Sequence, residues 1–233
     1  RTNLQRLQIC DQYKVSYNRD LISDIKSELS GHLKDTVVAM FNSLVDYDCF
    51  SLRSSLKGLS KDEDALLEII STRPTYMIKQ IIERYQKKYE KRNLIEDLKS
   101  ETSGVLRSIL IYLLQNEREE KINVDQEECN NFAKQLFEGG EKKWGTDDSI
   151  FIKIFATKSP LELVMIARSY HKLSGHTILQ AINNEFSGNI KNLLSAIVYS
   201  AISPSEYFAT RINKALKGLG TNDKLLIRVI VTR

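Results

Sequence analysis

The chain has few of the residues that interrupt or cross-link a fold. Its 233 residues include three Pro, ten Gly and three Cys. So little Pro and Gly argues against disordered, collagen-like and turn-dense all-β chains. The cysteines (Cys10, Cys49 and Cys129) lie far apart and form no C-x-x-C pair. This spacing favours free thiols in a reducing compartment over a disulfide scaffold.

Long apolar runs and a strong charge imbalance are also missing. No run approaches the roughly 20 apolar residues that a membrane-spanning helix needs, and the N-terminus shows no signal-peptide pattern. The formal net charge is +4, which is too mild to indicate nucleic acid. The three histidines have no metal-ligand spacing, and no Ser-His-Asp arrangement or carboxylate pair is evident. We therefore expect neither nucleic-acid binding nor enzyme activity.

Apolar residues recur at helical spacing along almost the whole chain. Clear stripes run through residues 33–44, 105–114 and 190–198. Spacings of three and four residues place such side chains on one face of a helix. Alternating strand patterns are rare, so the sequence predicts an all-α fold.

Three short motifs repeat along this helical sequence in a constant order. Glu-x-Ser-Gly begins at Glu28, Glu101 and Glu185. A basic residue closes an apolar run at Arg73, Lys158 and Arg233, and Arg1 occupies the corresponding place one period earlier. The basic positions are separated by 72, 85 and 75 residues. Motifs that stay in phase predict a repeat protein with a period near 75 residues.

The third motif is a Gly-containing loop before the start of a helix. It reads KGLSKD at residues 57–62, KWGTD at 143–147 and KGLGTN at 217–222. Such a loop can cradle phosphate, form a tight turn or offer carbonyl oxygens to a hard cation. The Walker spacing is missing, and a plain turn does not explain an acidic residue at a fixed distance. Calcium explains both features because it takes about six to eight oxygen ligands. The EF-hand spacing is absent, so another type of site is expected.

These residues resemble the annexins. Annexin repeats carry K-G-x-G-T-[DE], followed about 38 residues later by Asp or Glu, in four α-helical units of about seventy residues. Residues 217–221 match the whole loop, and Glu185 lies 39 positions beyond Thr146. Residues 139–145 are similar to the longer, Trp-bearing loop of third repeats. The resemblance covers the whole chain and implies an array of repeats of about five helices each.

The same resemblance divides the chain into segments. Residues 1–45 are expected to be the C-terminal part of repeat 1, 46–115 repeat 2, 116–127 an acidic linker, 128–200 repeat 3, and 201–233 the N-terminal part of repeat 4. The linker accounts for the long 85-residue interval. The first and fourth repeats of annexins are neighbours. The apolar stripe Leu225, Leu226, Val229 and Ile230 would therefore be covered if the two partial repeats pack together. The simpler alternative is that the chain is a fragment of a longer protein.

The resemblance also assigns calcium ligands by repeat. The third-repeat site comprises the carbonyls of Gly140, Lys143 and Gly145 and the carboxylate of Glu185. The second-repeat site comprises the carbonyls of Leu56, Gly58 and Ser60 and the carboxylate of Glu101. It departs from the pattern because Ser60 replaces Gly, Lys61 replaces Thr and the acid comes one position late. The fourth repeat contributes Leu216, Gly218 and Gly220 without an acid, and the first contributes Glu28 alone.

Together these features predict a non-enzymatic, Ca²⁺-dependent binder of acidic phospholipid membranes. The expected location is the cytoplasm, with peripheral membrane association when Ca²⁺ rises. Trp144 is the predicted membrane contact, because the family places this position on a membrane-facing loop and Trp suits an interface. Its alternative role is to cover the local core. The alternative function is a Ca²⁺-independent scaffold that binds the cytoskeleton or partner proteins, which the altered second-repeat loop favours.

Overall fold

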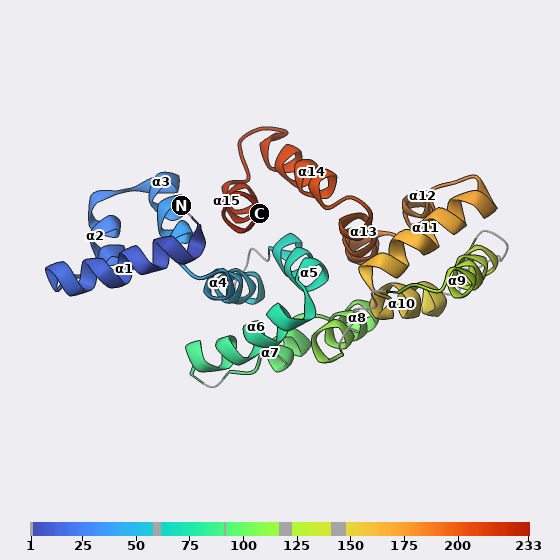
Figure 1. Cartoon of the computed structure of the whole chain (residues 1–233), viewed down its shortest axis with the longest axis horizontal. Helices are drawn as coiled ribbons and strands as arrows, with labels where there is room; N and C mark the ends of the chain where they lie inside the picture. Colours follow the sequence, from blue (N-terminus) through green and yellow to red (C-terminus); the bar gives the residue numbers. More distant parts are fainter. Residues whose placement is uncertain (1, 58–61, 91, 117–122, 141–147) are drawn as a thin grey trace.

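The structure is a computed structural model, and it describes the chain except for residues 1, 58–61, 91, 117–122 and 141–147. The described residues form fifteen α-helices and contain no strand, which confirms the predicted all-α fold. Figure 1 shows α1–α3 at one end of the array and α9–α12 at the other, with α4, α5, α14 and α15 between them.

The helices follow one another through short connections. The first three are α1 (Asn3–Tyr17), α2 (Leu21–Glu28) and α3 (Gly31–Met40). The next five are α4 (Leu44–Leu56), α5 (Glu63–Thr72), α6 (Thr75–Lys88), α7 (Leu94–Glu101) and α8 (Gly104–Gln115). Five more are α9 (Gln126–Gly139), α10 (Asp148–Thr157), α11 (Pro160–Ser174), α12 (Ile178–Glu185) and α13 (Gly188–Ile202). The last two are α14 (Pro204–Leu216) and α15 (Asp223–Thr232).

Helix lengths repeat with a period of five helices. Helices α4–α8 contain 13, 10, 14, 8 and 12 residues, and α9–α13 contain 14, 10, 15, 8 and 15. Helices α1–α3, with 15, 8 and 10 residues, match the last three positions of this series. Helices α14 and α15, with 13 and 10 residues, match the first two. The array therefore consists of two five-helix units flanked by two partial units.

Polar caps start α5 and α15, which follow two of the Gly-containing loops. The side chain of Asp62 accepts a hydrogen bond from the backbone N–H of Ala65 at the start of α5, and Asn222 does the same for Leu225 at the start of α15. Each cap satisfies one of the backbone donors that a helix N-terminus leaves unpaired. Each loop therefore ends at a fixed position on the helix that follows it.

The two complete units share one hydrophobic core. It includes Leu52, Ile69 and Leu110 from the first unit and Leu136 and Phe155 from the second. The shared core arises because α5 packs against α13, and α8 packs against α10 and α13. The two units therefore hold their loops and acidic residues on one continuous scaffold.

The two partial units contact each other, which covers part of the apolar stripe of α15. Helix α15 packs on α3 and α14, and Val231 is buried with Ala39 and Tyr47. Leu225 and Val229 are buried against Ala215. The apolar stripe of α15 is not completely covered, because Ile230 is 58% exposed. The remaining stripe residue, Leu226, is partly buried.

Two further sequence features can be placed on the helices. The acidic segment expected over 116–127 overlaps the first turn of α9 by two residues, because Asp125 caps that helix and Gln126 begins it. Cys49 and Cys129 are buried, Cys10 is half-buried, and all three are free thiols. No described helix has the length and apolar character needed to cross a bilayer.

Candidate functional site

The Glu-x-Ser-Gly motif forms the same local structure three times. Its glutamates, Glu28, Glu101 and Glu185, are the last residues of the eight-residue helices α2, α7 and α12. The two residues after each glutamate are extended. The motif glycines, Gly31, Gly104 and Gly188, have φ values of +59°, +58° and +57°. Only glycine adopts this conformation at little cost. The motif glycine therefore allows the turn that follows each glutamate at the end of its helix.

The third-repeat residues Gly140 and Glu185 are connected through a phenylalanine. Gly140 is buried at the end of α9, where an added Cβ would lie 3.1 Å from Cζ of Phe151. On another side, the Phe151 ring meets that of Phe186, the neighbour of Glu185, at 5.3 Å between centroids. Phe151 on α10 therefore packs against both the start of the predicted loop and the end of α12.

The second-repeat residues Leu56 and Glu101 line one small cavity of about 20 Å³. Glu63, in the first turn of α5, lines the same cavity, and its carboxylate accepts a hydrogen bond from the amide of Asn189 at 2.5 Å. Sequence reasoning missed both Glu63 and Asn189. Their positions in the sequence could have indicated them, because Glu63 directly follows the loop at residues 57–62 and Asn189 directly follows a Glu-x-Ser-Gly motif.

The fourth-repeat loop is the K-G-x-G sequence that the structure describes in full. Gly218 and Gly220 have φ values of +111° and +89°, and no atom lies within 4 Å of a Cβ added to either. Backbone conformation, rather than lack of space, therefore requires glycine at both positions. The backbone N–H of Asn222 donates to the carbonyl of Ala215 at 2.8 Å and closes the loop. Leu216 and Leu219 are both exposed, Leu219 fully.

Several predicted site residues lie outside the described residues. They are Gly58, Ser60, Lys143, Trp144 and Gly145. Of the predicted acids, Glu185 is half-buried, whereas Glu28 and Glu101 are exposed. The described part of the chain holds no cluster of three or more His, Cys, Asp or Glu side chains able to bind a metal ion. The assignment of these residues to calcium thus stays a prediction.

A buried network of ion pairs joins α5 to α14 and α15 and was not predicted. Glu68 on α5 is 1% exposed and accepts hydrogen bonds from Nε of Arg228 at 3.1 Å and Nε of Arg211 at 3.0 Å. A second buried pair joins Arg73 to both carboxylate oxygens of Asp48, at 2.6 and 2.8 Å. The signal was a charged residue inside an apolar stripe: Glu68 interrupts residues 66–70, and Arg228 interrupts residues 225–231.

The pKa shifts of Arg228 and of Asp64, which pairs with Arg211 and Lys214, favour the charged forms of both side chains. Burial lowers the pKa of Arg228, but Glu68 and Asp62 outweigh it and raise the value overall. Burial raises the pKa of Asp64, but a hydrogen bond from Lys214 and the charge of Arg211 bring it below its ordinary value. The network therefore joins acidic side chains of α5 to basic side chains of α14 and α15.

Comparison with known proteins gives a consistent result. A family model described as Annexin matches residues 1–40, 47–113 and 131–197. Annexin A5 of Rattus norvegicus is 40% identical over all 233 residues, which span 73% of that protein. Annexin A6 of Gallus gallus is also 40% identical over 233 residues, which span only 35% of its length.

Solved structures give the same result for the fold. Annexin III matches with a TM-score of 0.93 and 36% identity, covering 100% of this chain and 72% of that one. A calcium-bound annexin (Sm)1 matches with a TM-score of 0.89 and 27% identity, covering 100% of this chain and 70% of that one.

Proposed function

Because this chain belongs to the annexin family, we propose that it binds membranes containing acidic phospholipids when Ca²⁺ is present. Calcium and phospholipid binding are characteristic of this family. The proposed activity is binding without catalysis. The proposed location is the cytoplasm, with the protein reaching the membrane surface when Ca²⁺ rises.

The donor set of the loops is suited to calcium. Backbone carbonyls and one carboxylate per loop are hard oxygen ligands, which Ca²⁺ prefers. In the third repeat we assign the carbonyls of Gly140, Lys143 and Gly145 and the carboxylate of Glu185. The packing of Phe151 against Gly140 and Phe186 supports this assignment, because it fixes α9 and α12 relative to each other.

The remaining loops are assigned by the same motif. In the second repeat the proposed ligands are Leu56, Gly58, Ser60 and Glu101. In the fourth they are Leu216, Gly218 and Gly220, and Glu28 is the acid of the first. The shared cavity of Leu56 and Glu101 supports the second assignment, and the left-handed glycines support the fourth.

The surface around the loops is suited to an anionic membrane. When bound, Ca²⁺ supplies positive charge and open coordination positions for phosphate oxygens. Lys57, Lys142, Lys143 and Lys217 flank the loops and would add attraction to the negative surface, which salt weakens. Trp144 and the exposed Leu219 would contribute apolar contact at the interface.

The observation that carries this proposal is the threefold recurrence of a glutamate at the end of an eight-residue helix. Co-sedimentation with vesicles of phosphatidylserine and phosphatidylcholine tests it. We expect the protein to pellet with Ca²⁺ and to stay in the supernatant with a chelator. Glu185→Gln should need more Ca²⁺, whereas Glu96→Gln, an exposed change on α7, should behave like the parent.

The Ca²⁺-independent scaffold is the second candidate. One observation favours it: Ser60 occupies the position where the fourth-repeat loop has Gly220 at a φ of +89°, a conformation costly for Ser. Lys61 also adds a positive charge beside the predicted cation. Equal pelleting with vesicles in the presence and absence of Ca²⁺ would overturn the calcium dependence of the proposal. No pelleting with vesicles, together with Ca²⁺-independent retention on cytoskeletal filaments, would support the scaffold and overturn the membrane proposal.

A further inference from the structure

Helix α1 carries the core residues of a third helix, but they are uncovered. The isoleucines and tyrosines at the same two places in α1, α6 and α11 are Ile9, Ile81 and Ile166, and Tyr13, Tyr85 and Tyr170. Those of α6 and α11 are fully buried, and the first helix of each complete unit packs there, α4 on α6 and α9 on α11. In α1, by contrast, Ile9 is 44% exposed and no residue is buried. Helix α1 therefore presents a face that a first helix covers in both complete units.

Helix α14 is a first helix whose matching face is also uncovered. It aligns with α4, because Leu-Lys-Gly-Leu follows at residues 56–59 and 216–219. Cys49 of α4 is fully buried, and its thiol donates to the carbonyl of Ile81 on α6 at 3.4 Å. The equivalent residue of α14, Ala209, is exposed. Figure 1 shows α14 and α1 apart, so the two faces do not pair within one chain.

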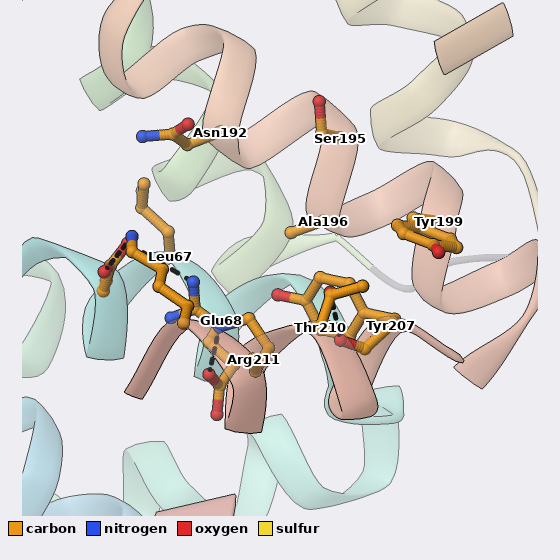
Figure 2. Close-up of a pocket in the computed structure, with 11 residues that line it drawn as sticks. Leu67, Glu68, Asn192, Ser195, Ala196, Tyr199, Tyr207, Thr210 and Arg211 are labelled. Carbon is orange, nitrogen blue, oxygen red and sulfur yellow. Dashed lines mark hydrogen bonds and ion pairs between the residues drawn. The ribbon is translucent and has the colours of Figure 1, made fainter. Parts of the chain in front are cut away.

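Another face of α14 is already used within the chain. Its residues Tyr207, Thr210 and Arg211 line a cavity of about 310 Å³ beside α5 and α13 (Figure 2). Nε of Arg211 donates to Glu68 of α5 at 3.0 Å and holds this side of the helix in place. Ala209 lies on a different face, because residues 206, 209, 213 and 216 follow one another at spacings of three and four. That face remains available to a partner.

The neighbouring helices α15 and α3 extend these two faces. In the complete units α5 and α10 each pack on both fifth helices, α8 and α13, whereas α15 packs chiefly on one fifth helix, α3, among the described residues. Ile230 of α15 is exposed, although its equivalent on α5, Ile70, is buried. Leu33 of α3 is also exposed. The apolar face of α14 thus continues onto α15, and that of α1 continues onto α3.

Polar groups at the edges of the two faces are complementary. In the first complete unit, Nε of Arg84 on α6 donates to Asp46 of α4 at 2.7 Å. A serine–asparagine hydrogen bond of 2.7 Å joins α11 to α9 in the second. The equivalents of Arg84 and Asp46 are Gln12 of α1 and Glu206 of α14, which are both exposed. An amide donor on one face therefore matches a carboxylate acceptor on the other.

Helices α1 and α2 also reproduce a polar site that receives a first helix. Asp24 accepts a hydrogen bond from Tyr13 at 2.8 Å, as Asp97 of α7 accepts one from the equivalent tyrosine of α6 at 2.7 Å. Asp97 accepts a further hydrogen bond from Arg53 of α4 at 2.8 Å. The residue of α14 equivalent to Arg53 is Asn213, which is exposed and carries an amide that can donate to Asp24.

We propose that copies of this chain associate through these faces, with α14 and α15 of one copy packed on α1 and α3 of another. The contact joins a two-helix partial unit to a three-helix partial unit and so completes a unit of five helices. The two faces differ, so the interface is heterologous: every copy offers one face of each kind.

Analytical ultracentrifugation of the full chain without Ca²⁺ or lipid tests this contact independently of membrane binding. We expect the mean mass to rise above 26.8 kDa as the concentration increases. Ile9→Glu and Ala209→Glu should each weaken association about tenfold or more, because each places a carboxylate against apolar side chains. Val15→Glu is the matched control on α1. Its equivalents in α6 and α11, Lys87 and Lys172, are exposed in the complete units, so this variant should associate like the parent.

Mixing the two defective variants makes the outcome decisive. Ile9→Glu retains the parental α14 and Ala209→Glu retains the parental α1, so an intact contact forms only between the two variants. We expect the mixture to associate at concentrations where neither variant does so alone. Gln12→Glu and Asn213→Glu, which place carboxylates opposite acidic side chains, replace a variant whose circular dichroism shows that it does not fold.

Four results would overturn the proposal. They are a parent that stays monomeric at every concentration, folded variants that associate like the parent, a Val15→Glu control as defective as Ile9→Glu, and a mixture that fails to associate.

Discussion

A Cβ atom on Gly140 would lie 3.1 Å from Cζ of Phe151, closer than ordinary van der Waals contact. The same phenylalanine packs edge-on against Phe186, the residue after Glu185. The glycine at the end of α9 therefore has a packing reason as well as a place in the loop motif. Its size allows α10 to approach α9 while Phe151 holds the end of α12.

Gly140→Ala should destabilise the protein and weaken the third-repeat calcium site together. Forcing a methyl group into this packed contact is expected to cost about 1–3 kcal/mol of unfolding free energy. Urea unfolding and calorimetric Ca²⁺ titration would measure the two effects. Combining the change with Phe151→Leu should recover part of the loss, because the smaller side chain makes room. Strictly additive losses would mean that Gly140 and Phe151 are not coupled.

Glu68→Gln should be among the most destabilising single changes in the chain. It removes the charge that faces Arg228 and Arg211. Because Arg228 is 2% exposed, it would become a buried and undercompensated cation, at a cost of about 3–5 kcal/mol. Glu96→Gln, which alters an exposed pair with Lys99, should cost at most about 1 kcal/mol. Similar unfolding midpoints for both variants would show that the buried network contributes little.

Ser60→Gly should strengthen the second-repeat site. The equivalent position in the fourth-repeat loop is Gly220, whose φ of +89° is costly for any residue with a side chain. Removing that strain should make Ca²⁺ bind more tightly, by a factor of up to about five if the relief is about 1 kcal/mol. Calorimetry in a Glu185→Gln background would isolate this site. Unchanged affinity there would indicate that Ser60 already tolerates the ligand conformation.

Acid stability should depend in part on Asp64. Burial raises its pKa, but Lys214 and Arg211 outweigh this and keep the folded-state pKa below its ordinary value. The unfolded state therefore binds a proton more readily. Asp64 thus stabilises the fold fully above a pH of about 4, and this contribution is lost as the pH falls through the folded-state pKa. Unfolding free energy measured from pH 7 to 3 should fall less steeply in Asp64→Asn than in the parent. Parallel curves would contradict this role.

Much of the fold was predictable from the sequence, because its signals are local and repeated. The apolar stripes gave the all-α class, and the Glu-x-Ser-Gly motif marked the ends of α2, α7 and α12. Polar residues such as Asp62 and Asn222 marked helix starts. Each of these signals depends on neighbours within a few residues of the chain.

The unpredicted features depend on contacts between distant segments. Glu68 and Arg228 are 160 residues apart and form a buried pair only because α5 packs near α15. The contact of Glu63 with Asn189 and the packing of Phe151 against Gly140 also depend on how separate helices pack together. The cavity beside Arg211 is made by helices from three units, so no single repeat contains its pattern.

Fluorescence of Trp144 tests the central claim most directly, because it is the single tryptophan of the chain and adjoins the proposed third-repeat ligands. Anionic vesicles with Ca²⁺ should shift its emission to the blue, and a chelator should reverse the shift. Glu185→Gln should require more Ca²⁺ for the same shift while keeping the parent's helical circular dichroism. Emission that is already blue and indifferent to vesicles and Ca²⁺, or a shift unaffected by Glu185→Gln, would contradict a calcium-dependent membrane contact at this loop.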